Sequence, residues 1–77
     1  MTDRLLDACG LICPLPVLKA RKVLLGLQAG DVLRVRVTDA HAPKDFALFC
    51  RESGHVLRSV EEKDGFVEVT LVCKQAA

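Results

Sequence analysis

Hydrophobic and polar residues alternate along much of this chain in patterns that predict β-strands. Residues 31–39 and 66–73 show this alternation, and residues 4–9 and 56–62 are two further strand candidates. In the second segment Leu33, Val35 and Val37 face one way, whereas Arg34 and Arg36 face the other, because successive side chains of a strand point to opposite faces. We therefore expect a sheet with one apolar face and one partly solvated face.

Apolar residues at helical spacing predict two helices between these strands. The first is expected to begin at Pro14, because the first turn of a helix does not need the N–H that proline lacks. We expect Gly30 to close it as a left-handed cap. The second helix is expected over residues 43–53, with Gly54 as its stop. The apolar face of the first helix consists of Val17, Ala20, Val23, Leu24 and Leu27.

The order of these elements is βαβαββ and predicts a two-layer α/β sandwich of the α+β class. The first strand, helix and strand imply a parallel pair, and Asp64-Gly65 favours a tight antiparallel hairpin at the end of the chain. Both helices should cover one face of a mixed four-stranded sheet. With 77 residues, the chain is expected to form a single domain over residues 1–77.

Composition narrows the functional classes. The net charge is +1, which argues against a strong electrostatic footprint for nucleic acid or membrane. The start, Met1-Thr2-Asp3-Arg4, does not resemble a secretory signal, and the chain has no apolar run near the ~20 residues that span a bilayer. We therefore expect a cytoplasmic protein whose four cysteines are reduced thiols.

Three of the four cysteines have an ordinary structural interpretation. Cys50 lies beside Phe46 and Phe49 on the apolar side of the second predicted helix, and Cys73 is in register with an inward-facing row, so packing is favoured for both. Cys9 is predicted to pack or to act as a local spacer, with a resolving thiol as the alternative.

Cys13 differs because of its neighbours. It should be the N-cap of the first helix, where the helix dipole favours an anion such as a thiolate or a persulfide. Pro14 and Pro16 supply no N–H, so the predicted activation is modest, and the prolines favour a sulfur atom held in a fixed, exposed position. Gly10 allows the chain to turn into this segment.

Other chemistries use the same residues and stay open. A Cys-His hydrolase would need His41 or His55 near Cys13, and a thiol-disulfide switch would pair Cys9 with Cys13. A metal site could combine these two cysteines with a histidine, although no paired metal-ligand spacing supports it. The face that carries Arg34 and Arg36 could meet nucleic acid, but it lacks stacking aromatic residues.

The segment from Leu6 to Val17 resembles the signature of the TusA (SirA-like) family of sulfur carriers. In that family a Cys-Pro-x-Pro motif opens the first helix, as Cys13-Pro14-Leu15-Pro16 does here. The resemblance extends over essentially the whole chain, and its two-layer fold agrees with the predicted order of elements. Further matching residues are Arg21-Lys22, Asp39, Lys44-Asp45 and Phe49-Cys50.

This resemblance implies a sulfurtransferase-type relay protein, a carrier rather than a stand-alone catalyst. Cys13 would accept sulfane sulfur as a persulfide from a cysteine desulfurase or a rhodanese and pass it to an acceptor protein. Downstream routes would be transfer RNA thiolation, cofactor sulfuration or sulfur oxidation. Arg21, Lys22 and Asp45 would contribute to partner docking. No metal, separate cofactor, direct nucleic-acid contact or membrane contact is expected.

Overall fold

The computed structural model describes residues 2–74 and has the predicted βαβαββ order. Its helices are α1 (Leu15–Leu25) and α2 (Ala42–Ser53). Its strands are β1 (Asp3–Asp7), β2 (Val32–Val37), β3 (Val56–Lys63) and β4 (Phe66–Val72). Each element lies within two residues of its predicted bounds, apart from the end of α1.

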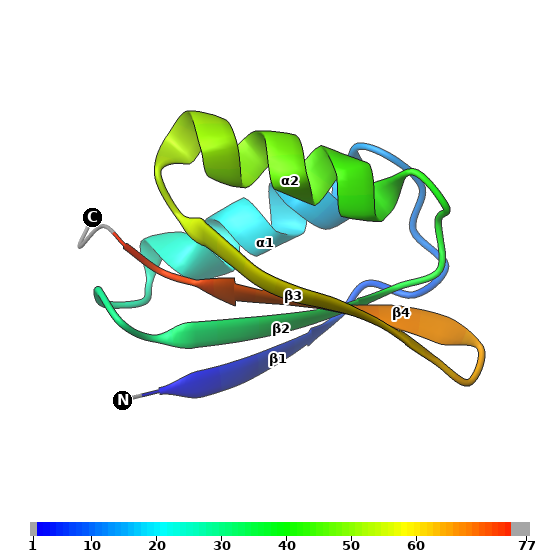
Figure 1. Cartoon of the computed structure of the whole chain (residues 1–77), viewed down its shortest axis with the longest axis horizontal. Coiled ribbons are helices and arrows are strands. Elements are labelled where there is room, and N and C mark those ends of the chain that lie inside the picture. Colours follow the sequence, from blue (N-terminus) through cyan, green and yellow to red (C-terminus); the bar gives the residue numbers. More distant parts are fainter. Residues whose placement is uncertain (1, 75–77) are drawn as a thin grey trace.

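The strands form one mixed sheet in the order β1-β2-β4-β3. β1 runs parallel to β2, whereas β2 and β3 both pair antiparallel with β4, and the hairpin turns at Asp64 and Gly65. Both helices lie on the same side of this sheet, which makes two layers (Figure 1). The predicted two-layer α+β fold is therefore confirmed.

The core lies between the helices and the sheet. Leu33, Val35 and Val37 of β2 are fully buried, and Phe46 of α2 packs among them without exposed surface. Ala20, Leu24 and Leu27 line the buried side of α1 and the turn after it. The alternation of β2 and the helical spacing of α1 thus predicted the correct inward faces. Within residues 2–74, no helix is long and apolar enough to cross a membrane.

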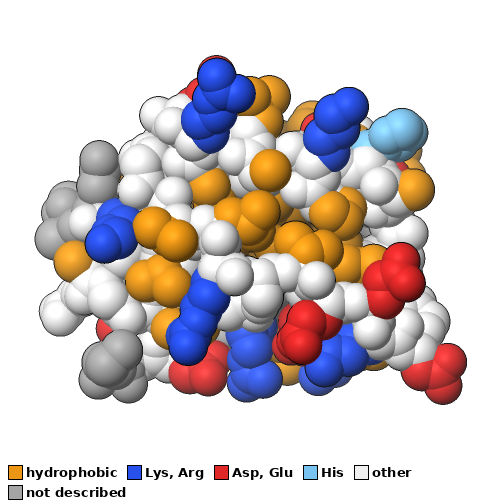
Figure 2. Space-filling view, viewed as in Figure 1, with side chains coloured by type: hydrophobic (Ala, Val, Ile, Leu, Met, Phe, Trp, Pro, Cys, Tyr) orange, Lys and Arg blue, Asp and Glu red, His pale blue; other side chains and the backbone are white. Residues whose placement is uncertain are grey.

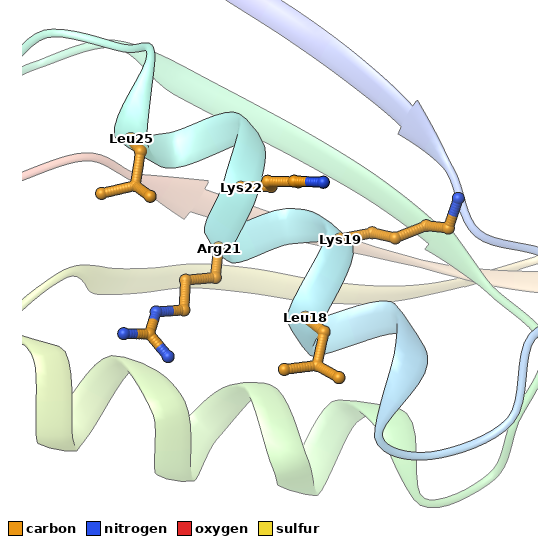
Figure 3. Close-up of a pocket in the computed structure, with 5 residues that line it drawn as sticks. All are labelled: Leu18, Lys19, Arg21, Lys22 and Leu25. Atoms are coloured by element: carbon orange, nitrogen blue, oxygen red, sulfur yellow. The ribbon is translucent and has the colours of Figure 1, made fainter.

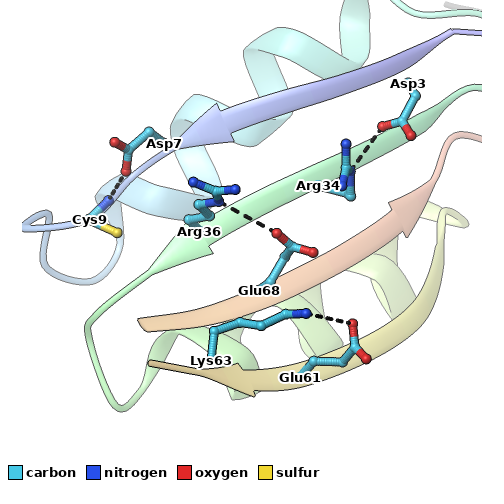
Figure 4. A network of polar contacts seen from close by, with 8 residues as sticks. All are labelled: Asp3, Asp7, Cys9, Arg34, Arg36, Glu61, Lys63 and Glu68. Carbon is cyan, nitrogen blue, oxygen red and sulfur yellow. Dashed lines mark hydrogen bonds and ion pairs between the residues drawn. The ribbon is translucent and has the colours of Figure 1, made fainter. Parts of the chain in front are cut away.

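The opposite face of the sheet carries charged side chains in pairs (Figure 4). Arg34 Nε lies 3.1 Å from Asp3 Oδ1, and Arg36 Nε lies 3.5 Å from Glu68 Oε1. The Arg36 guanidinium also sits 5.0 Å from the centre of the Phe66 ring. The two arginines are about two-fifths exposed, at 42% and 40% of the side chain, so the predicted partial solvation of this face is confirmed. Each arginine faces a carboxylate, which reduces the charge that this face offers to nucleic acid.

The prediction that Gly30 caps the first helix is wrong. α1 ends at Leu25 with Gly26 as its C-cap, and the N–H groups of Gly26 and Leu27 donate to carbonyls three residues earlier. Gly30 does have a positive φ of 94°. That conformation serves the entry into β2, because the Gly30 N–H donates to the carbonyl of Cys73 at 2.7 Å and ties this turn to the end of β4. Gly54, by contrast, ends α2 as predicted, and it does so as a left-handed C-cap.

Candidate functional site at Cys13

The carboxyl ends of β1 and β2 place two loops side by side at one end of the molecule (Figure 1). This follows from the parallel pairing, because parallel neighbours end at the same edge of a sheet. The N–H of Gly10 donates to Thr38 Oγ1 at 2.9 Å and joins the loop after β1 to the loop after β2. Cys13 lies at the end of the first of these loops, just before α1.

Cys13 is exposed, and it is not the N-cap that the sequence predicted. The N-cap is Pro14, with no side-chain cap, and the Cys13–Pro14 peptide bond is cis. The helix begins one residue later than expected because the Leu18 N–H donates to the carbonyl of Pro14, whereas the Leu15 N–H turns back to that of Ile12. The thiol therefore precedes the helix instead of capping it.

Two aspartates hold Cys13 by separate hydrogen bonds. The backbone N–H of Cys13 donates to Asp39 Oδ2 at 2.6 Å, and its Sγ donates to Asp45 Oδ2. The hydrogen bond to Asp45 is the main cause that raises the pKa of the Cys13 thiol above its ordinary value, with desolvation and the negative charges of both aspartates adding to it. The predicted lowering of this pKa by the helix dipole is therefore wrong.

Asp39 organises the loop that faces Cys13. Its other oxygen, Oδ1, accepts the N–H of His41 at 3.0 Å, so the carboxylate joins the start of α2 to the segment before α1. These two backbone hydrogen bonds, from His41 first and then from Cys13, lower the pKa of Asp39. A charged Asp39 is thus the form that this loop geometry favours.

A groove between the two helices opens beside Cys13. We call it the Cys13 groove; it has a volume of about 220 Å³. Its apolar lining includes Val17 from α1 and Leu48 from α2, and Leu48 is 53% exposed. Asp45 and Glu52 add two carboxylates from α2. The thiol is therefore presented at the edge of an apolar groove with an acidic side.

The hydrogen bonds of the two histidines go to residues other than Cys13. His41 is the N-cap of α2, where its backbone N–H bonds Asp39. His55 follows α2 and accepts the Lys74 N–H on Nδ1, with its ring 5.8 Å from that of Phe49. Burial lowers the pKa of His55. Neither ring is hydrogen-bonded to Cys13 in the described chain, whereas a Cys-His hydrolase would pair its thiol with such a base.

The other cysteines divide into two groups. Cys50 and Cys73 are buried, as predicted. Cys9 is exposed in the turn after β1, so of its predicted roles core packing is wrong, while the local spacer and the resolving thiol stay predictions. Its N–H donates to Asp7 Oδ1, and β1 ends at Asp7 rather than at Cys9 (Figure 4). Desolvation, followed by the hydrogen bond with Asp7, raises the pKa of the Cys9 thiol.

The basic residues of α1 surround a second depression, which has a volume of about 390 Å³ (Figure 3). Leu18, Arg21 and Leu25 project from one side of the helix, and the two leucines are 51% and 61% exposed. Lys19 and Lys22 extend to the other side. Arg21 and Lys22, predicted to help dock a partner, thus lie on an open surface of α1, whereas Asp45 lies at the thiol itself.

In the part of the chain that the structure describes, no cluster of His, Cys, Asp or Glu has the arrangement of a metal site.

The sequence did not predict that Asp39 and Asp45 form hydrogen bonds with Cys13. A usable signal existed for Asp39, because polar residues after two parallel strands meet at one edge. Asp45 carries a weaker signal, as an acidic residue in the first turn of a helix is commonly explained by the helix dipole alone. Only the packing of α2 beside α1 brings its carboxylate to the sulfur.

Sequence comparison identifies relatives of this chain. Residues 4–72 match the family model described as "Sulfurtransferase TusA". A putative sulfur carrier protein of Neisseria meningitidis serogroup B is 54% identical over 65 residues, which cover 84% of this chain and 88% of the relative. The sulfur carrier protein TusA of Allochromatium vinosum is 44% identical over 63 residues, which cover 82% and 83% of the two chains.

A solved structure gives the same result at the level of the fold. The SirA-like protein of Desulfitobacterium hafniense superposes with a TM-score of 0.81 at 32% identity, and the match covers 94% of this chain and 99% of that one. Its two-layer arrangement agrees with the sheet order and helix placement described above. On its sequence, its fold and the extent of the family match, this chain belongs to the TusA family of sulfur carrier proteins.

Proposed function

We propose that this protein carries sulfur as a persulfide on Cys13 and relays it between two partner proteins. The observation that carries the proposal is the placement of an exposed thiol at the edge of an open groove, with its backbone held by Asp39. A carrier needs a sulfur atom that protein partners can reach, and it needs no catalytic base of its own. Within residues 2–74 no histidine is hydrogen-bonded to this thiol, which is compatible with a carrier whose partners supply the catalytic groups.

The transfer is a simple exchange at sulfur. The Cys13 thiolate attacks the terminal sulfur of a donor persulfide, so a new S–S bond forms at Cys13 while the S–S bond of the donor breaks. The donor sulfur leaves as a thiolate and takes up the proton that Cys13 released. Delivery to the acceptor repeats the step in the other direction, and no external oxidant or reductant is needed.

Sulfur donors and acceptors would dock on the helical side of the molecule. Figure 2 views the two layers edge-on, with the helices above the sheet, and shows exposed hydrophobic side chains with Lys and Arg among them. Arg21 and Lys22 lie on α1, close in sequence to the motif, and they suit an acidic surface on a partner. We propose a cysteine desulfurase or a rhodanese as donor, in the cytoplasm, and a route towards transfer RNA thiolation, cofactor sulfuration or sulfur oxidation. The sulfur itself, held covalently, is the only cargo in this proposal.

Mass spectrometry after incubation with a cysteine desulfurase and cysteine tests the proposal. The expected result is a gain of one sulfur atom that maps to Cys13 and is removed by a thiol reductant. The variant Cys13→Ser should gain none, whereas Cys9→Ser, which removes the other exposed thiol, should load normally. Loading that persists in Cys13→Ser would overturn the proposal. Loss of loading in Cys9→Ser would favour the alternative, a redox switch built from both cysteines.

A further inference from the structure

The hydrogen bond between Cys13 and Asp45 is unusual for a thiol that must attack another sulfur. The thiolate is the nucleophile, yet a carboxylate oxygen can only accept a hydrogen bond from the protonated thiol. A carboxyl group is also far more acidic than a thiol, so the shared proton belongs on sulfur. The resting geometry therefore favours the unreactive form of Cys13.

Every charged group that acts on this sulfur in the described structure is acidic. Asp45 approaches it from the first turn of α2, and Asp39 approaches from the loop before α2. Glu52 adds a third carboxylate on the same side of the Cys13 groove. His41 donates its backbone N–H to Asp39 Oδ1, whereas the Cys13 N–H uses Oδ2, and His41 is not among the groups that shift the pKa of Cys13. Both the hydrogen bond and the local field thus oppose ionisation of the thiol.

We propose that Asp45 keeps the Cys13 thiol protonated, a role that we call the protonation lock. The lock is released when a cationic side chain of a sulfur-transfer partner enters the Cys13 groove and pairs with the Asp45 carboxylate. This inference rests on the proposed function and names the chemistry of the partner group. A Lys or Arg at that point would neutralise Asp45, take over its hydrogen bond and leave the sulfur free to ionise. The leaving thiolate of the donor accepts the released proton, so the exchange stays balanced.

The groove itself argues for a cation on an otherwise apolar segment. Its carboxylates, Asp45 and Glu52, lie on α2, whereas Val17 and Leu48 supply the apolar lining. A partner loop with a basic residue beside an apolar one would match both features. The lock would also restrict attack by small oxidants and alkylating agents on an exposed cysteine, since reactivity follows the thiolate fraction.

Alkylation kinetics test the lock without any sulfur donor. The full chain carrying Cys9→Ser, which leaves Cys13 as the exposed thiol, is treated with iodoacetamide over a range of pH, and the rate at Cys13 is followed by mass spectrometry. Adding Asp45→Asn should lower the pH at which the alkylation rate of Cys13 rises, and should make the reaction several-fold faster near neutrality. Glu52→Gln removes the same charge from the groove but not the hydrogen bond, and should move the titration less. Equal shifts in the two variants, or none with Asp45→Asn, would overturn the lock.

A pair of charged thiol reagents tests the chemistry of the partner group. Cationic trimethylammonium-ethyl and anionic sulfonato-ethyl methanethiosulfonates both react with a thiolate, so the ratio of their rates cancels the degree of ionisation. We expect Cys13 to prefer the cationic reagent several-fold, and Asp45→Asn to reduce that ratio. A ratio of one or less in the unmodified groove would overturn the cation proposal.

These outcomes are separable from the proposed function. If the titration and the reagent ratio behave as expected but Cys13 gains no sulfur from a desulfurase, the lock stands and the carrier role fails. If Cys13 loads normally and Asp45→Asn changes neither measurement, the carrier role stands and the lock fails.

Discussion

The carboxylate of Asp39 accepts the backbone N–H of Cys13 at 2.6 Å, although the two residues are 26 positions apart in the chain. Its second oxygen holds the N–H of His41 at 3.0 Å. One side chain thus fixes the loop before α1 against the loop before α2. The position of the sulfur at the mouth of the Cys13 groove depends on this bridge.

Replacing Asp39 should therefore impair sulfur transfer more than it impairs folding. We expect Asp39→Ala to slow loading of Cys13 by a persulfide donor several-fold, because the freed loop spreads the sulfur over several positions. Asp31→Ala is the matched control. It also removes a carboxylate that accepts two backbone N–H groups, at 3.0 and 2.9 Å, but these come from Thr2 and Gln28, away from the thiol. Equal loading rates in the two variants, measured by quenched-flow mass spectrometry, would contradict the bridge.

Phe46 should be indispensable for folding. It is the largest fully buried side chain, and it belongs to the cluster that joins α2 to the sheet. Truncating a buried phenylalanine costs about 3–5 kcal/mol, which is comparable to the total stability of about 3–5 kcal/mol expected for so small a core. We expect Phe46→Ala to be unfolded by circular dichroism and Phe46→Leu to fold with a lower urea midpoint. A cooperative transition in Phe46→Ala close to that of the wild type would contradict this role.

Acid should destabilise the fold through three aspartates. Backbone hydrogen bonds lower the pKa of Asp7, Asp31 and Asp39 in the folded chain. A carboxyl with a depressed folded-state pKa stabilises the fold above its unfolded pKa of about 3.9, and this contribution is lost as the pH falls through the folded value. We expect the melting temperature to fall on acidification below about pH 5.

The variant Asp31→Asn isolates one part of this acid effect. It should melt below the wild type near neutrality, because an amide cannot accept both N–H groups on two oxygens. The difference in melting temperature should shrink in strong acid, where the wild-type carboxyl is itself protonated. A difference that stays constant over the whole range would exclude Asp31 as a contributor.

The basic side of α1 should control the encounter with an acidic partner surface. Arg21 projects between the exposed Leu18 and Leu25, so a charge reversal there alters an open surface and not the core (Figure 3). We expect Arg21→Glu to weaken binding of a donor desulfurase several-fold and to reduce the salt dependence of that binding. Arg58→Glu, a charge reversal at another exposed position, on β3, is the control. Titration calorimetry that finds the same loss for both variants would point to net charge instead of a defined surface.

Local patterns in the sequence determined the elements and their inward faces. Leu33, Val35 and Val37 alternate strictly, and a strand has only two faces, so their burial could be predicted without tertiary information. Gly54 and the Asp64-Gly65 turn were predictable for a similar reason, because few residues tolerate those backbone conformations. The Cys13-Pro14-Leu15-Pro16 motif likewise marked the thiol that the structure exposes.

Tertiary structure decided the chemistry around that thiol. From the sequence, Cys13 was predicted to cap α1 and to have a slightly lowered pKa, because the nearest feature along the chain is a helix start whose two prolines limit the effect. The structure instead sets Asp39 and Asp45, 26 and 32 positions away, against its N–H and its sulfur. A hydrogen bond from a distant carboxylate outweighs a dipole that acts only at the helix end. Such partners are determined by how α2 packs beside α1, and no local pattern encodes that packing.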